Sequence, residues 1–306
     1  MSKLPLDVPI VFVIFNRPSL TRQVFDVIRQ VKPSQLFVIA DGYDGDDETK
    51  IRAIAETRRI IDEVNWECEV RKNYSETNLG CARRVSSGLD WIFEQVEEAI
   101  ILEDDCVPDL AFFWFCEELL EKYRFDDRIF SISAQNFYPQ ADHPYSYTFS
   151  QHHHCWGWAT WKRAWNYFDF DMKLWSEVRE KNLLQDIFCE TSAIKSWNQI
   201  FKSTYSGEIN SWAYRWSFAC LLQNALSIHP KCHLVTNIGF GDDATHTTST
   251  NSSFAHIKTQ AIESPLKHPP FIVRDVKADH YIQQKAFQLT GWQMTKSLVK
   301  DLIMAK

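Results

Sequence analysis

Three consecutive carboxylates, Glu103, Asp104 and Asp105, follow directly on an apolar run at residues 99–102. Clustered carboxylates repel one another and raise one another's pKa unless a cation lies among them. Mg²⁺ and Mn²⁺ prefer oxygen ligands, and when one or two carboxylates hold them they complete their coordination with water and phosphate. The triplet therefore predicts Mn²⁺ or Mg²⁺ that bridges the protein and a phosphorylated ligand and stabilises a departing diphosphate.

The absence of other well-known catalytic and nucleotide-binding motifs narrows the class of enzyme. The chain has no GxxxxGK[ST] loop and no GxGxxG after its first apolar run, which disfavours P-loop NTPases and dinucleotide dehydrogenases. It also lacks HExxH and GxSxG. What remains is a metal-dependent sugar-nucleotide transferase or a nucleotidyltransferase. The second half is rich in Trp, a natural platform for sugar rings, and this favours the sugar nucleotide.

The elements that must position the triplet alternate along the first half of the chain. We expect strands near residues 8–15, 36–40, 69–72, 99–102 and 129–133, with helices near residues 19–31, 48–64, 81–96 and 109–123. This order predicts an α/β fold with a mainly parallel, Rossmann-like sheet and helices on both faces. Ligands of such sheets bind beyond the carboxyl ends of the strands. Those ends carry Asn16, Arg17, Asp41 and the acidic triplet.

The second half has a different character. We expect short strands near residues 145–149, 226–229 and 233–236, and helices near residues 192–205, 212–222 and 279–305. A polar run at residues 245–253 lacks hydrophobic periodicity and predicts a flexible loop. We therefore divide the chain into a nucleotide-sugar-binding half (residues 1–140), a Trp-rich acceptor lobe with a closing loop (residues 141–260) and a helical C-terminal extension (residues 261–306).

Several ordered motifs resemble a known family. They are FNRP (residues 15–18), NLGCARR (residues 78–84), LEDDCVPDLAFFWF (residues 102–115), WGWATWKRAW (residues 156–165) and NIGFGDDATHT (residues 237–247). Together they resemble the glycosyltransferase A fold, and more closely the branch-initiating N-acetylglucosaminyltransferases and their bacterial sugar-transferase relatives. The resemblance covers about residues 8–250 and implies a UDP-sugar donor and a glycan or glycolipid acceptor.

The resemblance also implies roles for individual residues. Asp105 would ligate the metal directly, His246 would be a second ligand on a closing loop, and Asp41 would accept a hydrogen bond from uracil N3–H. The nucleotide and diphosphate would be bound by Phe15, Asn16, Arg17, Asp41, Asn78, Arg83, Arg84, Glu103, Asp104 and His246. For Arg83 and Arg84 an ordinary helix-surface charge is an equal alternative.

One position departs from the family pattern. An inverting transferase needs a carboxylate base for the acceptor hydroxyl, and acids are expected directly after Trp212. Ala213 and Tyr214 stand there instead. We expect the base to be displaced to Glu208, Asp242 or Asp243. A retaining mechanism without a separate base, and a non-catalytic relative that binds a sugar nucleotide or glycan, are the alternatives.

The aromatic segment after residue 150 invites both packing and binding roles. We expect Trp156, Trp158 and Trp212 to shape the acceptor site, and Trp161 and Trp165 to pack in the core from one helix. Residues 152–154 are three histidines. On a strand they would point to alternating faces, so we expect a polar strand end near the acceptor site and not a metal site.

Composition sets the remaining limits. The chain has 306 residues, a net charge of −7 and no basic tract, which excludes a nucleic-acid partner of the usual kind. Eight cysteines without paired spacing predict buried reduced thiols and a cytoplasmic protein. We expect no signal peptide and no transmembrane segment, which leaves a peripheral association with the membrane open.

Overall fold

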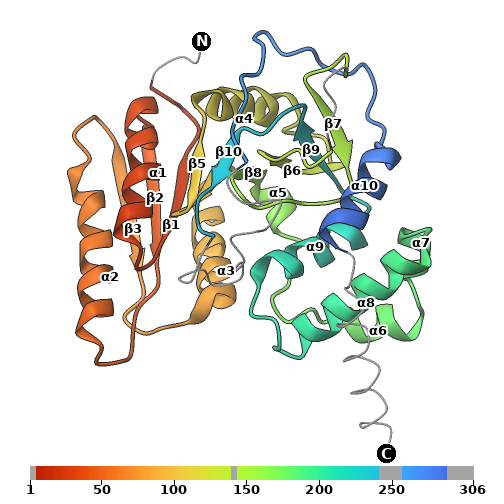
Figure 1. Cartoon of the computed structure of the whole chain (residues 1–306), viewed down its shortest axis with the longest axis horizontal. Helices are drawn as coiled ribbons and strands as arrows, with labels where there is room; N and C mark the ends of the chain where they lie inside the picture. Colours follow the sequence, from red (N-terminus) through yellow and green to blue (C-terminus); the bar gives the residue numbers. More distant parts are fainter. Residues whose placement is uncertain (1–4, 139–142, 241–256, 288–306) are drawn as a thin grey trace, which may run out of the picture.

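The structure is a computed structural model that describes residues 5–138, 143–240 and 257–287. An eight-stranded sheet with the order β3-β2-β1-β4-β8-β6-β9-β7 runs through it (Figure 1). A second sheet pairs β5 with β10. The strands are β1 (Ile10–Ile14), β2 (Gln35–Ala40), β3 (Glu69–Tyr74), β4 (Glu98–Glu103), β5 (Cys106–Pro108), β6 (Ile129–Ser133), β7 (Tyr147–Ser150), β8 (Trp158–Trp161), β9 (Leu226–Pro230) and β10 (Val235–Asn237).

The first four strands of the large sheet are parallel, and their register aligns their carboxyl ends. Ile14 is opposite Ala40, and Val13 is opposite Glu103. The residues that follow β1, β2 and β4 therefore meet at one edge of the sheet. Beyond β4, β8 is antiparallel to both of its neighbours, β6 and β9 are parallel, and β7 closes the edge in the antiparallel sense. This sheet confirms the predicted mainly parallel α/β fold.

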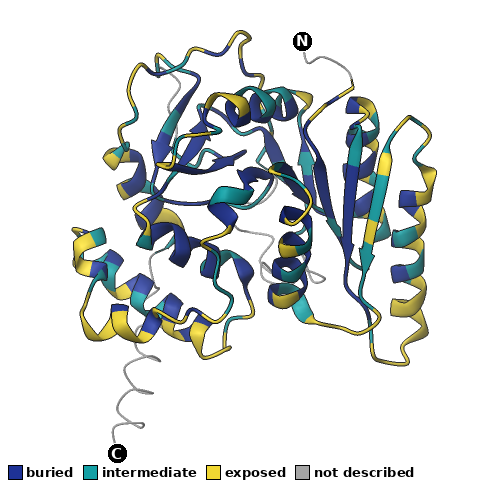
Figure 2. Ribbon diagram, turned by 180° about the vertical axis from the view of Figure 1, so that it is seen from behind, coloured by how far each residue is buried: buried dark blue, intermediate teal, exposed yellow. Residues whose placement is uncertain are grey.

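The helices cover both faces of the sheet, as predicted. They are α1 (Pro18–Val31), α2 (Glu48–Ile60), α3 (Gly80–Phe93), α4 (Leu110–Lys122), α5 (Lys162–Trp165), α6 (Trp175–Glu180), α7 (Leu184–Ile187), α8 (Thr191–Tyr205), α9 (Trp212–Leu222) and α10 (Val276–Ala286). Successive strand residues point to opposite faces, so Phe12 packs with α1 and α4, whereas Val11 packs with α3 and α9. Figure 2 shows the central strands buried along their length, which explains their continuous apolar sequence.

A third apolar cluster builds a helical lobe beside the sheet. Trp175, Trp197, Phe201 and Phe218 join α6, α8 and α9 in this cluster. In Figure 1 the lobe lies at the lower right, with α6, α7 and α8 grouped together. Strands β7, β8 and β9 come from beyond residue 140 but belong to the large sheet. The large sheet therefore contains strands from both sides of residue 140, where we expected the first half to end.

Some local predictions were wrong. Trp161 ends strand β8, so it does not share a helix with Trp165, although both side chains are buried in the core as expected. Helix α1 begins at Pro18, one residue before the predicted start, and Arg17 occupies the N-cap position without a side-chain capping hydrogen bond. Strands β5 and β8 were not anticipated.

The remaining segments add three observations. Helix α10 begins at Val276 and ends at Ala286, and Phe287 is at its C-cap position. Every cysteine of the chain lies in the described residues and carries a free thiol, and Cys189 is exposed. Within those same residues no helix combines the length and the apolar character that crossing a membrane requires.

Candidate functional site

The acidic triplet and Arg17 meet at the carboxyl edge of the sheet. One arm of the Arg17 guanidinium, Nη2, donates to Asp104 Oδ1, and the other, Nη1, lies 3.1 Å from Asp105 Oδ2. The backbone N–H of Phe15 donates to the second oxygen of Asp104 at 3.3 Å. The loop after β1 therefore holds the residues after β4 through one bidentate side chain and one amide. Asn16 lies half-buried in the same loop.

The charges of this cluster do not balance. Burial and the charges of Asp105 and Asp104 raise the pKa of Glu103 to about 8. Burial raises the pKa of Asp104 to about 6, although the charge of Arg17 opposes this shift. Burial would lower the pKa of Arg17, but the neighbouring carboxylates outweigh it and raise that pKa. One guanidinium thus serves three carboxyl groups, and the site favours additional positive charge.

The segment after β10 lies directly against Asp105. The backbone N–H of Ile238 donates to the carbonyl of Asp105 at 2.8 Å, which fixes the segment in place. A Cβ atom on Gly239 would fall 2.0 Å from Asp105 Oδ2. Only glycine permits this approach. No role for Gly239 was predicted from the sequence. Its place as a glycine within the NIGFGDDATHT motif is the signal that could have indicated a close approach of the backbone.

The described residues around Asp105 fit a metal ion that one carboxylate holds together with water and phosphate. They do not form a site in which protein side chains surround the ion. Asp105 Oδ2 faces the Arg17 guanidinium, and its other carboxylate oxygen accepts from the thiol of Cys106 at 3.3 Å. In the described part of the chain, no three His, Cys, Asp or Glu side chains are grouped to hold a metal ion. A single carboxylate with water and phosphate oxygens is the arrangement expected for Mg²⁺ or Mn²⁺. His246, the predicted second ligand, lies outside the described residues.

Asp41 anchors the first turn of α3. Its Oδ1 atom accepts from the backbone N–H of Leu79 at 2.9 Å, and its Oδ2 atom accepts from that of Gly80 at 2.9 Å. Asn78 Oδ1 accepts from Gly80 as well, at 2.9 Å. The φ angle of +75° at Gly80 explains why this motif contains glycine. Asp41 Oδ1 also accepts from the backbone N–H of Gly42 at 3.0 Å, and each carboxylate oxygen has two acceptor sites, so these contacts leave one acceptor site open on Oδ2.

Arg84 is buried, so the alternative of an ordinary helix-surface charge was wrong for this residue. Its side chain is buried and donates to the backbone carbonyls of Ala40 at 3.2 Å and of Asn73 at 2.8 Å. Arg84 therefore ties the ends of β2 and β3 to α3. Arg83 is exposed, and its guanidinium carbon lies 4.2 Å from the ring centre of Phe170, in the connection between α5 and α6.

Two of the three predicted acceptor tryptophans belong to the core. Trp158 and Trp212 are buried and stack on each other with ring centres 5.4 Å apart. The Trp212 side chain lies close enough to Glu103 to lower the pKa of that carboxyl group. They therefore cannot present a face to a sugar, because the large apolar area of each ring is used in packing. Trp156 is half-buried and packs edge-on against Phe240, so it alone keeps the predicted role.

The candidates for the catalytic base are only partly described. Glu208 is exposed in the turn between α8 and α9 and accepts a hydrogen bond from Ser203 Oγ at 2.9 Å. Asp242 and Asp243 lie outside the described residues. The two residues that stand where acids were expected both pack against apolar clusters. Ala213 packs against the apolar cluster that joins α3 and α9, and Tyr214 packs against the cluster of the helical lobe.

The histidines at 152–154 lie in a connection, not on a strand. His153 Nδ1 is 2.8 Å from Ser131 Oγ, and the backbone carbonyl of His152 accepts from His229 Nε2 at 2.8 Å. Burial lowers the pKa of His152 and of His153 to about 3. They are neutral groups inside the protein, so the expectation of an acceptor-side strand end was wrong.

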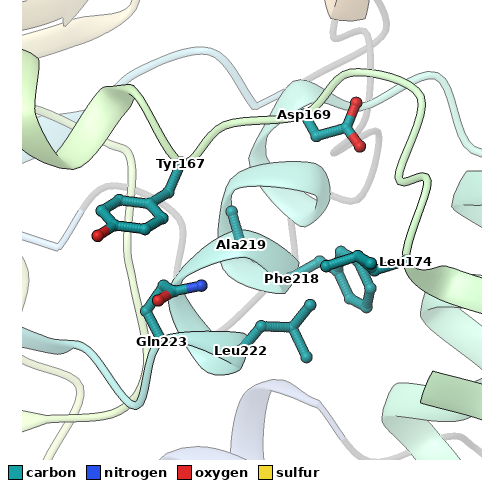
Figure 3. Close-up of a pocket in the computed structure, with 7 residues that line it drawn as sticks. All are labelled: Tyr167, Asp169, Leu174, Phe218, Ala219, Leu222 and Gln223. Atoms are coloured by element: carbon teal, nitrogen blue, oxygen red, sulfur yellow. The ribbon is translucent and has the colours of Figure 1, made fainter. Parts of the chain in front are cut away.

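A small cavity of about 50 Å³ lies beside the C-terminal half of α9 (Figure 3). Apolar side chains and the polar Gln223 and Asp169 line it. None of the residues that the sequence predicts as catalytic, donor-binding, metal-binding or acceptor-binding lines this cavity. It is therefore separate from the acidic cluster.

No family model matches the chain, and no curated protein matches it. A UDP-glucose pyrophosphorylase complexed with UDP-glucose is 11% identical with a TM-score of 0.27, and the match covers 47% of this chain and 62% of that protein. A 4-diphosphocytidyl-2C-methyl-D-erythritol synthase from Anaerococcus prevotii DSM 20548 is 13% identical, with 64% and 84% covered and a TM-score of 0.30. Mouse xyloside xylosyltransferase 1, in its apo form, is 11% identical, with 70% and 81% covered and a TM-score of 0.30. TM-scores this low carry no argument about function.

Proposed function

We propose that the protein is a metal-dependent glycosyltransferase that moves a sugar from a UDP-sugar to a glycan or glycolipid acceptor with inversion at the anomeric carbon. The unbalanced charge of the acidic triplet is the observation that supports this proposal most. Glu103, Asp104 and Asp105 share one guanidinium at the ligand edge of a parallel sheet. A divalent cation and the diphosphate that accompanies it would restore the balance.

The donor would bind across the ends of β1, β2 and β4. Asp105 would hold the metal, which when bound supplies Lewis-acid stabilisation of the leaving diphosphate. Arg17, whose guanidinium is already fixed by Asp104, would direct its remaining donors to phosphate oxygens. Asp41 would orient the uracil, and Phe15 and Asn16 would line the nucleotide pocket. The backbone at Asn78 and Gly80 would keep the rim of this pocket rigid.

The acceptor would approach from the side of α9 and the α8–α9 turn. A carboxylate there would take the proton of the acceptor hydroxyl while the oxygen forms its bond to the anomeric carbon and the bond to the UDP oxygen breaks. Glu208 belongs to this turn, and the turn contacts α3 because Asn210 Oδ1 accepts from the backbone N–H of Ala82 at 3.3 Å. Asp242 and Asp243 are the other candidates for this base.

A second candidate function is binding of a sugar nucleotide or glycan without catalysis. The packing of Ala213 and Tyr214, where acids were expected, favours it. A nucleotidyltransferase would share the metal chemistry but would leave the large helical lobe without a role.

Release of UDP over a panel of UDP-sugars, with and without an acceptor mixture, separates these functions. The proposal predicts metal-dependent UDP release that Asp105→Ala abolishes. Asp109→Ala is the matched control, because Asp109 caps α4 by accepting from the backbone N–H of Ala111 at 2.8 Å. Loss of this capping hydrogen bond should cost about 1 kcal/mol of stability and leave the metal site intact. Tight UDP binding without any release would favour the binding protein.

A further inference from the structure

Two guanidinium groups lie against one aromatic ring at the first turn of α3. The guanidinium carbon of Arg83 is 4.2 Å from the ring centre of Phe170, and that of Arg215 is 4.6 Å from the same ring centre. A ring attracts a cation by about 0.5–2 kcal/mol, depending on exposure. Two cations at one ring also repel each other, so this arrangement favours an anion nearby.

Arg215 supplies fixed charge to this pair. Its side chain is buried, and its guanidinium donates to the backbone carbonyls of Phe170 at 2.8 Å, Ser211 at 2.6 Å and Thr204 at 3.1 Å. Burial, and then the charge of Arg83, lower the pKa of Arg215. Arg215 is therefore held in place by the protein, and Arg83 is the member of the pair that can reach a ligand.

Arg83 differs from the other arginines that stack on rings. Among the described residues, its guanidinium has no oxygen partner, and it is exposed. Every other arginine stacked on a ring there also binds a protein oxygen: Arg29, Arg58, Arg71, Arg163 and Arg215. The stack thus orients a planar fork of N–H donors and leaves those donors available.

The pair lies beside the donor site and on its acceptor side. Cys81 precedes Arg83 by two residues, and burial and the charge of Glu103 raise the pKa of Cys81 to about 12. Trp212, whose side chain lowers the pKa of Glu103, precedes Arg215 by one turn of α9. Both helices therefore lead from the acidic cluster to the arginine pair. Phe170 belongs to the connection that leads into the helical lobe, away from β1 and β2.

We propose that Arg83, supported through Phe170 by Arg215, binds an oxyanion of the acceptor, either a phosphate or a carboxylate. Both groups present two oxygens that match the guanidinium fork. The acceptor would then be a phosphorylated glycolipid or an acidic glycan, and not a neutral sugar. This identity of the ligand depends on the proposed transferase function, whereas the oxyanion site itself does not.

The test follows the arginine Nε–H signals of the ¹⁵N-arginine-labelled full chain by NMR during titration with inorganic phosphate and, separately, with glucuronate. Each titration is run without and with UDP and Mg²⁺. The expected result is a saturable shift of the Arg83 signal that persists when UDP and Mg²⁺ are present. Arg71 is the matched control, because it stacks on Phe37 but is paired with Glu69, so its signal should not move.

Two variants keep the result interpretable. Arg83→Gln should remove the response, and Phe170→Leu should weaken it several-fold because the platform is lost. Absence of a saturable shift with either anion, or an equal shift at Arg71, would overturn the proposal. A tenfold loss of UDP affinity in Arg83→Gln would place Arg83 on the donor diphosphate and would also overturn it. Failure of the wild-type chain to bind UDP would contradict the transferase function, while the Arg83 titration would still report on the oxyanion site.

Discussion

Arg17 Nη1 lies 3.1 Å from Asp105 Oδ2, the same oxygen that a Cβ atom at position 239 would approach to 2.0 Å. The carboxylate that we propose as the metal ligand is therefore neutralised by a side chain in the free protein. A metal ion and Arg17 must share Asp105 or compete for it. This relationship links the stability of the free protein to its affinity for metal, and the first prediction depends on it.

Arg17→Gln should destabilise the free protein and increase its response to Mn²⁺. The substitution leaves Asp104 and Asp105 buried without a cation, which we expect to cost about 2 kcal/mol, because Arg17 is partly exposed. Saturating Mn²⁺ should then raise the melting temperature of the variant more than that of the wild type. Thermal melts with and without Mn²⁺ measure both effects.

Arg22→Gln is the control for that prediction. Arg22 pairs with Glu63 at an exposed position on α1, five residues from Arg17. Its loss should change neither the melting temperature appreciably nor the response to Mn²⁺. Equal metal responses in Arg17→Gln and the wild type would contradict competition at Asp105.

Gly239→Ala should weaken metal-dependent UDP binding by at least tenfold. The new methyl group would overlap Asp105 Oδ2, so either the carboxylate or the segment after β10 must move. Such overpacking costs about 1–3 kcal/mol. Gly207→Ala serves as the control, because it adds strain at a φ of +79° but meets nothing within 4 Å. The control should lose some stability and keep its UDP affinity, and an unchanged UDP affinity in Gly239→Ala would show that Asp105 does not depend on this contact.

Arg84→Gln should reduce stability without affecting the donor site. The variant loses charge-assisted hydrogen bonds to the buried carbonyls of Ala40 and Asn73, which should cost about 2–3 kcal/mol. Urea denaturation measures this loss, and calorimetry with UDP should show less than a threefold change in affinity. A large loss of UDP affinity in a folded variant would support our original interpretation of Arg84 as a phosphate ligand.

The buried histidines should lower the stability as the pH decreases from about 6.5 towards 4, whereas Glu103 and Asp104, whose pKa values are raised, act in the opposite direction. Burial lowers the pKa of His152 and His153 to about 3 and that of His229 to about 4. Between these values and the usual pKa of about 6.5, the unfolded chain binds protons that the folded chain does not. Each histidine can therefore contribute up to about 1.4 kcal/mol per pH unit in this range and nothing above it.

Urea midpoints measured across the pH range test this linkage. His153→Gln should flatten the dependence below pH 6.5, because one of the neutral buried groups is removed. An equal dependence of stability on pH in His153→Gln and in the wild type would contradict the inferred neutral state of His153.

The position of the acidic triplet could be predicted because its physical cause is local. An apolar run that ends in carboxylates must leave the sheet at a strand end, and alternation with helices makes the sheet parallel. Strand β8 could not be predicted in this way. Trp158–Trp161 is only four residues long and buried throughout. A short buried strand and a short buried helix have the same pattern.

The roles of Arg83 and Arg84 show a different limit. The two residues are adjacent and chemically identical, but a helix turns by about 100° per residue. Arg84 therefore faces the buried side of α3, with Val85 and Gly88, while Arg83 faces outward. Likewise, the sequence alone does not distinguish a tryptophan that packs in the core, such as Trp158 or Trp212, from one that lies on a binding surface. Only the packing of β8 against α9 decides between the two roles.

Calorimetric titration with UDP, in the presence and absence of Mn²⁺, tests the central claim most directly. We predict that the wild type binds UDP tightly only with Mn²⁺, that Asp105→Ala loses this dependence, and that Asp109→Ala keeps it. UDP binding that is equally tight without the metal, or no binding under either condition, would contradict the assignment of Asp105 and the donor site.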